Sequence, residues 1–185
     1  MDVGPRSPQI FEALLARRQL LLQGDVDGDI QDKLTRYILY LNSIGDTPIT
    51  LFIDTPGGNT EFSLCISDMI RHSNSDVHGV VTCDAFSAGF RILQACRRRI
   101  AYPNARLMFH ATALNGVRCD SDRWDEACKR AFILHDDQVK LYVARTGQPE
   151  AQIRLWAKNE KRFTAQEALQ LGFLDAIAEP SKPAW

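Results

Sequence analysis

Apolar residues recur along the chain with two different periods, and these periods define the predicted elements. Short apolar runs bounded by glycine, proline or polar residues are typical of buried strands, whereas apolar residues three or four positions apart are typical of helices. Strands are predicted at residues 19–22, 49–54, 77–82 and 107–110. Helices are predicted over residues 30–45, 64–70 and 121–145, and from residue 87 onward. This strand–helix alternation predicts an α/β domain built mainly of parallel strands.

The segment from Ser121 to about Arg145 contains no proline or glycine and predicts one long helix. One of its faces carries Trp124, Cys128, Ala131, Phe132 and His135. The whole helix has more apolar side chains than one packing face covers, namely Trp124, Phe132, Leu134, Leu141 and Tyr142. The helix either packs entirely inside its own subunit or contributes to an interface between subunits. We favour the interface, because large exposed apolar patches usually mark one.

Length and composition indicate one compact domain. The chain has 185 residues, of which 45% are hydrophobic and 24% charged, and a chain of this size can bury a core without metals or disulfides. The 22 Lys and Arg residues nearly balance the 23 Asp and Glu residues, so no overall field attracts nucleic acid or an anionic membrane. We assign residues 9–178 to the domain and residues 1–8 and 179–185, each with two prolines, to short tails.

The cysteines and the lack of long apolar runs indicate a location. The five cysteines show no CxxC or Cys/His metal spacing, which is typical of free thiols in a reducing compartment; they are Cys65, Cys83, Cys96, Cys119 and Cys128. Residues 1–8 contain no apolar signal core, and no run approaches the ~20 apolar residues of a membrane-spanning helix. We therefore expect a cytoplasmic protein with no metal or cofactor and no membrane partner.

Candidate chemistry is concentrated in three motifs. Residues 54–58 (DTPGG) close an apolar strand in a glycine turn, residues 84–89 (DAFSAG) place Ser87 at a strand-to-helix junction, and residues 106–110 (RLMFH) end in His110. A serine, a histidine and free backbone N–H groups are the nucleophile, the base and the oxyanion donors of a serine peptidase.

Each of these residues also has a purely structural interpretation. Ser87 can cap the helix that follows it, and His110 can make a single hydrogen bond at a strand end. Gly57 and Gly58 can form a tight turn and nothing more. Taken residue by residue, the sequence leaves these alternatives open.

In order and spacing, the three motifs resemble ClpP, the family of proteolytic subunits of Clp proteases, from about Ile10 to about Ile177. Further landmarks of that resemblance are residues 102–106 (YPNAR), 146–148 (TGQ), 162–168 (RFTAQEA) and 171–175 (LGFLD). The resemblance implies the ClpP/crotonase fold, a spiral of β-β-α units with a protruding handle helix, the handle lying at about residues 111–145.

The resemblance also implies roles for particular residues. Ser87 falls at the position of the family's nucleophile and His110 at that of its general base, and the N–H groups of Gly58 and Ala88 would form the oxyanion hole. The three other histidines match no site of the family and are interpreted as surface or core residues: His72, His78 and His135. The chain would then assemble into a ring, of seven subunits or two such rings stacked, that admits only peptides or unfolded proteins.

One departure concerns the third member of the triad. Lys161 occupies the position of the aspartate that orients the histidine in ClpP, and a cation cannot stabilise the imidazolium that forms during attack. Either Asn159 or Glu160 takes that role, or Ser87 and His110 act as a dyad. The alternative is a catalytically impaired subunit that serves as a structural component of the ring.

Further departures concern the flanking segments. Asp54 stands where ClpP more often has asparagine, and the resulting DTPGG motif is more similar to that of signal-peptide peptidases. Ala88 stands where methionine is commoner in ClpP. Residues 1–8 are too few for the N-terminal hairpin of ClpP, which speaks against docking to an AAA+ unfoldase. Residues 111–120 retain one glycine where ClpP has a glycine-rich segment, so substrate and ring contacts are expected to differ. A crotonase-type acyl-CoA enzyme is the third alternative, which the serine–histidine pair and residues 172–175 disfavour.

Overall fold

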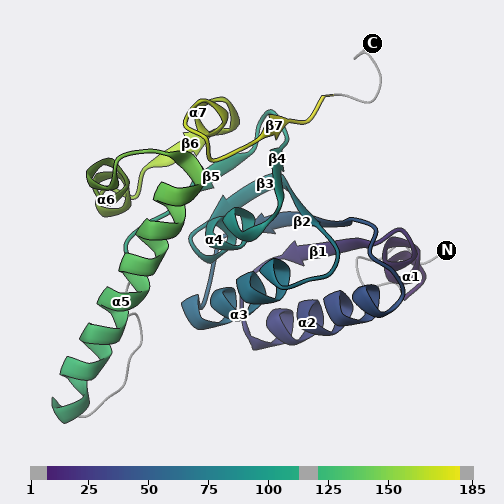
Figure 1. Ribbon diagram of the computed structural model, residues 1–185, viewed down its shortest axis with the longest axis horizontal. Helices are drawn as coiled ribbons and strands as arrows, with labels where there is room; N and C mark the ends of the chain where they lie inside the picture. The colour runs from purple at the N-terminus through teal and green to yellow at the C-terminus, as the bar shows by residue number, and fades with distance from the viewer. Residues whose placement is uncertain (1–7, 113–120, 180–185) are drawn as a thin grey trace.

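A computed structural model describes residues 8–112 and 121–179, and its centre is a seven-stranded sheet (Figure 1). The main path of the sheet runs in the order β1 (Gln19–Gln23), β2 (Ile49–Thr55), β3 (Val77–Phe86), β4 (Arg98–Ala101) and β7 (Ala176–Ile177). Two strands lie off this path: β5 (Arg106–Met108) pairs with β3, and β6 (Arg162–Thr164) pairs with β5. All pairs are parallel except β5–β6. The predicted α/β fold with mainly parallel strands is therefore confirmed.

Strand β3 is the longest strand of the described residues; it pairs with β2 along one edge and with two strands, β4 and β5, along the other. Its first half pairs with β4, with Val80 opposite Ile100, and its second half pairs with β5, with Phe86 opposite Met108. Because β3 and β5 are parallel, their carboxyl ends meet at one edge of the sheet. The segments that follow Phe86 and Met108 consequently start side by side.

The described residues contain seven helices. Helices α2 (Gly28–Ser43), α3 (Thr60–Arg71) and α4 (Ala88–Ala95) lie side by side along one face, while α1 (Pro8–Ala16) packs beside β1. Helices α6 (Glu150–Lys158) and α7 (Ala165–Gln170) flank β6, and α5 (Ser121–Thr146) projects from the body (Figure 1). The predicted tails, 1–8 and 179–185, lie outside the described residues except at Pro8, where α1 begins, and Glu179.

A cluster of aromatic rings anchors the base of α5 to the sheet. Phe109 contacts the rings of Phe90 and Tyr142 with centroids 5.0 and 4.8 Å apart, and it stacks on Phe163 at 5.7 Å. Phe173 packs against all of them. These rings come from α4, α5, β6 and the segments after β5 and α7, so one buried cluster joins elements that are distant in the sequence.

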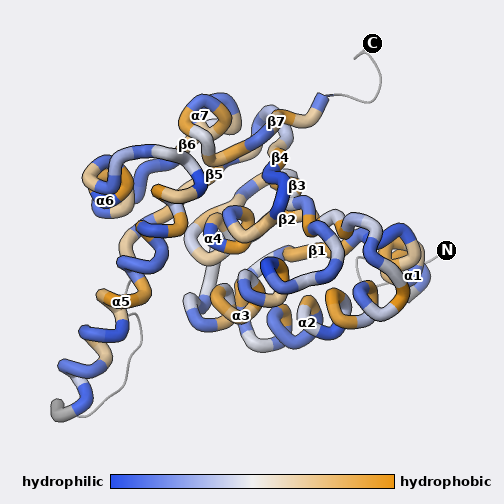
Figure 2. The backbone as a smooth tube through the Cα atoms, in the orientation of Figure 1, coloured by the Kyte–Doolittle hydropathy of each residue, from blue (hydrophilic) through white to orange (hydrophobic). Residues whose placement is uncertain are grey.

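The projecting part of α5 exposes apolar side chains. Its bounds agree with the helix predicted over 121–145, and Trp124, Phe132 and Ile133 are 48, 72 and 61% exposed. Figure 2 shows apolar and polar positions mixed along this part of the helix. The prediction was wrong for Tyr142, which is fully buried, because the aromatic cluster at the base of α5 encloses it.

Arg99 fixes the C-terminal strand to the sheet through a network of charged hydrogen bonds. Its guanidinium, only 5% exposed, donates to both carboxylate oxygens of Asp175, and it also donates to the Gln94 side chain and the Gly172 carbonyl. The Arg99 main-chain N–H donates to Asp175 as well. Burial of the Asp175 carboxyl opposes its ionisation, but these hydrogen bonds and the charge of Arg99 outweigh burial and lower its pKa.

We predict that Asp175→Asn lowers the free energy of unfolding by about 1–3 kcal/mol at pH 7, because Arg99 loses a charged acceptor. The folded-state pKa of Asp175 lies below its ordinary value of 3.8. Its contribution is therefore complete above pH 3.8 and is lost as the pH falls through the folded-state pKa. Urea denaturation at one protein concentration should show a difference between wild type and variant that shrinks in acid.

The matched control is Asp32→Asn, which removes an exposed ion pair with Arg36 on α2. Exposed pairs contribute less than about 1 kcal/mol, so this variant should stay close to wild type at both pH values. An equal effect of the two substitutions would contradict the special position of Asp175.

Candidate active site

Ser87 lies in a strained turn between β3 and α4. Its backbone has φ 51° and ψ −112°, a combination that costs a non-glycine residue about 1–3 kcal/mol. The Ser87 side chain makes no capping hydrogen bond to α4, so the interpretation of Ser87 as a helix cap is not supported. A strained strand-to-helix turn of this kind presents the nucleophilic serine in α/β-hydrolases.

Two contacts hold this turn in place. The Ser87 N–H donates to the Met108 carbonyl at 2.8 Å, which continues the β3–β5 pairing by one residue. Thr55, fully buried at the end of β2, packs against Gly89 so closely that a Cβ on Gly89 would overlap the threonine methyl. The start of α4 is therefore fixed from both β2 and β5.

The glycine turn after β2 lies directly against Ser87. Gly57 has φ 111°, and a Cβ on it would lie 2.7 Å from the Ser87 Cβ and 3.3 Å from the Ala88 nitrogen. Only a glycine permits this approach. The structure therefore brings together two of the predicted motifs, residues 54–58 and 84–89.

Gly58 is held from the other side by Val26. The Val26 N–H donates to the Gly57 carbonyl at 2.7 Å, and the Asn59 N–H donates to the Val26 carbonyl at 2.8 Å. These two bonds form a parallel bridge between Val26 and Gly58. Gly58 lies between the two bonded residues, so its N–H is directed away from Val26, and this N–H has no acceptor in the described hydrogen bonds. The N–H of Ala88, at the first position of α4, has no intrahelical acceptor either.

His110 follows β5 and is half-buried. The preceding Phe109 is fixed in the aromatic cluster, and the Gln138 side chain donates to the His110 carbonyl at 2.9 Å. The imidazole Nδ1 lies 2.6 Å from the Ala111 carbonyl oxygen. No hydrogen bond joins Ser87 and His110 within the described part of the chain; in unliganded active sites such bonds often form only with substrate.

The two candidates for the third triad position, Asn159 and Glu160, are not hydrogen-bonded to His110 in the described structure. Both residues follow α6 with exposed side chains. The Lys161 ammonium lies 3.7 Å from Glu167 and 5.3 Å from the Phe163 ring centroid. The segment is nevertheless close to the site, since the Ala111 N–H donates to the carbonyl of Ala157 at 3.2 Å.

A cavity of about 300 Å³ adjoins the residues after His110. It is lined by Ala111, Thr112, Cys128, Ala131, Phe132 and His135. The Thr112 hydroxyl and the His135 Nδ1 are buried without a hydrogen-bond partner. Burial, followed by the charge of Arg154, lowers the pKa of His135. The other two histidines lie elsewhere, His72 at the end of α3 and His78 in β3.

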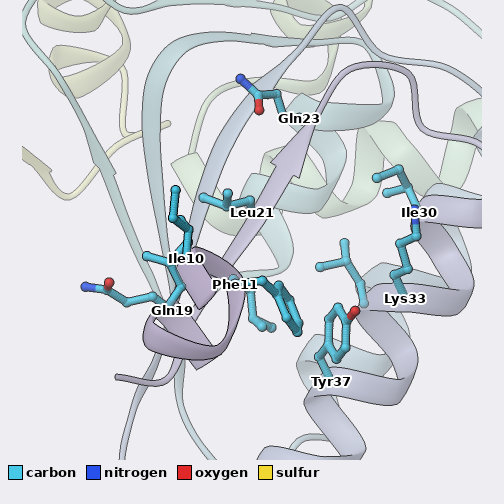
Figure 3. A pocket seen from close by; sticks show the side chains of 11 residues that line it. Ile10, Phe11, Gln19, Leu21, Gln23, Ile30, Lys33 and Tyr37 are labelled. Atoms are coloured by element: carbon cyan, nitrogen blue, oxygen red, sulfur yellow. The ribbon is translucent and has the colours of Figure 1, made fainter. Parts of the chain in front are cut away.

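A second apolar groove lies apart from this site. It runs between α1, β1 and α2, has a volume of about 320 Å³, and is lined by side chains such as Phe11, Leu21 and Tyr37 (Figure 3). None of its lining residues belongs to the three motifs. The groove is thus separate from the candidate active-site residues, which follow the carboxyl ends of β2, β3 and β5.

Several expectations concern groups other than the site. Residues 8–112 and 121–179 contain no cluster of three potential metal ligands and no helix long and apolar enough to cross a membrane. Cys65, Cys83, Cys96 and Cys128 are free thiols, and burial raises the pKa of Cys96 to about 12. Cys119 and most of the segment 111–120 lie outside the described residues.

Comparison with known proteins shows the family of the chain. The family profile described as Clp protease matches residues 2–181. The ATP-dependent Clp protease proteolytic subunit of Streptococcus agalactiae serotype V is 30% identical over 181 residues, which cover 95% of this chain and 92% of that protein. The subunit of the same name from Streptococcus sanguinis is 30% identical over 183 residues, covering 96% and 93%. The chain therefore belongs to the Clp protease family, and the resemblance seen in the sequence is confirmed.

We predict that Ser87→Gly is more stable than Ser87→Ala by about 1–2 kcal/mol in the free energy of unfolding, because glycine adopts positive φ without strain. Denaturation of the two variants at equal concentration measures the difference. As a control, Ala127→Gly inside α5 should instead destabilise the protein by about 0.5–1 kcal/mol. If Ser87→Gly were the less stable variant, Ser87 would not be strained in solution.

Proposed function

We propose that the chain is a ClpP-like serine peptidase in which Ser87 is the nucleophile and His110 the general base. The observation that carries the proposal is the strained turn at Ser87, whose N–H is bonded to Met108, two residues before His110. The glycine turn lies against the same serine. Strain of this kind is concentrated at functional sites.

The arrangement suits acyl transfer. Ser87 Oγ attacks the scissile carbonyl while His110 accepts its proton, and His110 then gives the proton to the leaving amine. The N–H groups of Gly58 and Ala88 donate to the oxyanion, and the positive end of the α4 dipole adds to this stabilisation. Water then hydrolyses the acyl-enzyme by the same steps in reverse order. The chemistry uses no cofactor.

We further infer that substrates are peptides or unfolded proteins and that the subunits assemble into a heptameric ring or two stacked rings in the cytoplasm. Family membership supports an oligomer with peptide substrates. The exposed side chains of Trp124, Phe132 and Ile133 on the projecting helix support an additional contact between subunits. Docking of an AAA+ unfoldase is not part of this proposal.

The second candidate function is a catalytically impaired subunit with a structural role in the ring. Lys161 favours it, because no side chain carboxylate is hydrogen-bonded to His110 in the described residues. Loss of the orienting carboxylate costs serine proteases about four orders of magnitude in kcat. The strained Ser87 favours the active enzyme, because a purely structural subunit gains nothing from the strain.

We predict that a fluorophosphonate probe labels the wild type once per subunit at Ser87, and that Ser87→Ala abolishes labelling. His110→Ala should slow labelling by about 100-fold or more, since general-base catalysis contributes about 10²–10⁴-fold. Intact-mass spectrometry measures both effects. His72→Ala, at the exposed end of α3, is the matched histidine control and should label like wild type. Equal labelling of Ser87→Ala would remove Ser87 from the mechanism.

We predict that light scattering at micromolar concentration gives a mass several times 20.9 kDa. Replacing Phe132 and Ile133 together by serine should reduce that mass or its stability to dilution, because the change removes exposed apolar surface from α5. Lys129→Ser on the same helix is the polar control and should assemble like wild type. A stable monomer of the wild-type chain would overturn the enclosed-chamber mechanism.

A further inference from the structure

The hydrogen bond between His110 and Ala111 determines which imidazole nitrogen carries the proton. Nδ1 lies 2.6 Å from the Ala111 carbonyl oxygen. A carbonyl oxygen can only accept, so Nδ1 must be the protonated nitrogen of the neutral ring. The other nitrogen, Nε2, then has a free lone pair. Nε2 is the atom that accepts the serine proton in serine proteases.

In a serine triad the aspartate selects this same tautomer. Its replacement by asparagine leaves the geometry intact but favours the wrong tautomer, which costs about 10⁴-fold in kcat. Here the corresponding Lys161 is directed at Glu167 and the Phe163 ring. Within the described structure, the Ala111 carbonyl is the acceptor that His110 has on Nδ1.

The peptide that joins His110 to Ala111, directly before this carbonyl, is held at both of its polar groups. The Ala111 N–H donates to the Ala157 carbonyl at the end of α6, at 3.2 Å. The carbonyl of His110 accepts from Gln138 of α5, whose side chain is 8% exposed. Because two helices fix this preceding peptide, the Ala111 oxygen is a preorganised acceptor. A chance contact of a free loop would have no such supports.

We propose that the main-chain carbonyl of Ala111 is the positioning group for His110, in place of the carboxylate that Lys161 has displaced. It fixes the ring orientation and the Nδ1–H tautomer, as backbone carbonyls do for many functional histidines. A neutral carbonyl stabilises the imidazolium less than a carboxylate does, so the enzyme is a working but slow peptidase. This inference rests on the proposed function.

The first test reads the tautomer directly. Solid-state NMR of the sedimented full-length protein, labelled with ¹⁵N-histidine, distinguishes the protonated from the unprotonated ring nitrogen at a pH where the ring is neutral. His110 is assigned by the signals lost in His110→Ala. His72, whose Nδ1 lies 2.9 Å from the Asp68 carbonyl, is an internal reference for the same tautomer. Protonation of His110 at Nδ1 is expected; protonation at Nε2 alone would overturn the proposal.

The second test weakens the carbonyl itself. Replacing Thr112 by its α-hydroxy analogue converts the Ala111 amide carbonyl into an ester carbonyl, which is a poorer acceptor, and the Thr112 N–H that is lost donates no hydrogen bond in the described structure. We expect a mixture of His110 tautomers and a kcat lower by about tenfold, with little change in KM. Thr112→Ala keeps the amide and should keep the Nδ1–H tautomer. Unchanged tautomer and kcat in the ester variant would contradict the proposal.

Lys161→Asp separates this inference from the proposed function. If the Ala111 carbonyl already occupies the Nδ1–H of His110, an aspartate at position 161 has no free ring N–H to accept from. The variant should then keep the wild-type tautomer and change kcat by less than about threefold. A gain of about 100-fold or more would show that the missing carboxylate limits the enzyme and would overturn the role of Ala111. Failure of the proposed function looks different, because fluorophosphonate would then not label Ser87 in any of these proteins.

Discussion

The candidate site depends on the hydrogen bond from the Ser87 N–H to the Met108 carbonyl. It extends the β3–β5 pairing one residue past the end of β3, so the strained serine is held by sheet geometry. A φ of 51° at Ser87 would relax if this bond and the contact with Gly57 were absent. The same pairing places His110 two residues beyond Met108. Ser87 and His110 are thereby positioned by one strand pair, which gives them a rigid support.

The aromatic cluster transmits this rigidity to the long helix. Phe90 lies in the first turn of α4, Phe109 directly precedes His110, and Tyr142 lies near the base of α5. Tight packing of large rings leaves little freedom for any one of them to move alone. The active-site segments and the projecting helix therefore share one core. A contact made by α5 with another subunit would act on a helix that is mechanically joined to the site.

The sequence by itself determined the α/β class and most of the larger elements. Apolar periods are strong where one face is buried, as in β2, where Ile49, Leu51 and Ile53 are buried and alternate with partly exposed residues. Six shorter elements were not predicted, namely α1, β4, α6, β6, α7 and β7. The strands among them have only two to four residues, too few to show a period. The strand predicted at 107–110 ends at Met108 in the structure, since β6 offers partners only for residues 106–108.

For the candidate site, the motifs singled out Ser87, His110 and the glycine turn, and the structure places the glycine turn directly against Ser87. Which side chains and backbone groups meet was decided only by the tertiary structure. A backbone acceptor such as the Ala111 carbonyl has no signature in the sequence, since every residue has a carbonyl and only the fold aims one. In the sequence, Gln138 is only one polar residue of a long helix. Its hydrogen bond to the His110 carbonyl depends on how α5 packs against the segment after β5. Lys161 likewise indicated a missing carboxylate, while its contacts with Glu167 and Phe163 depend on how β6 and α7 lie together.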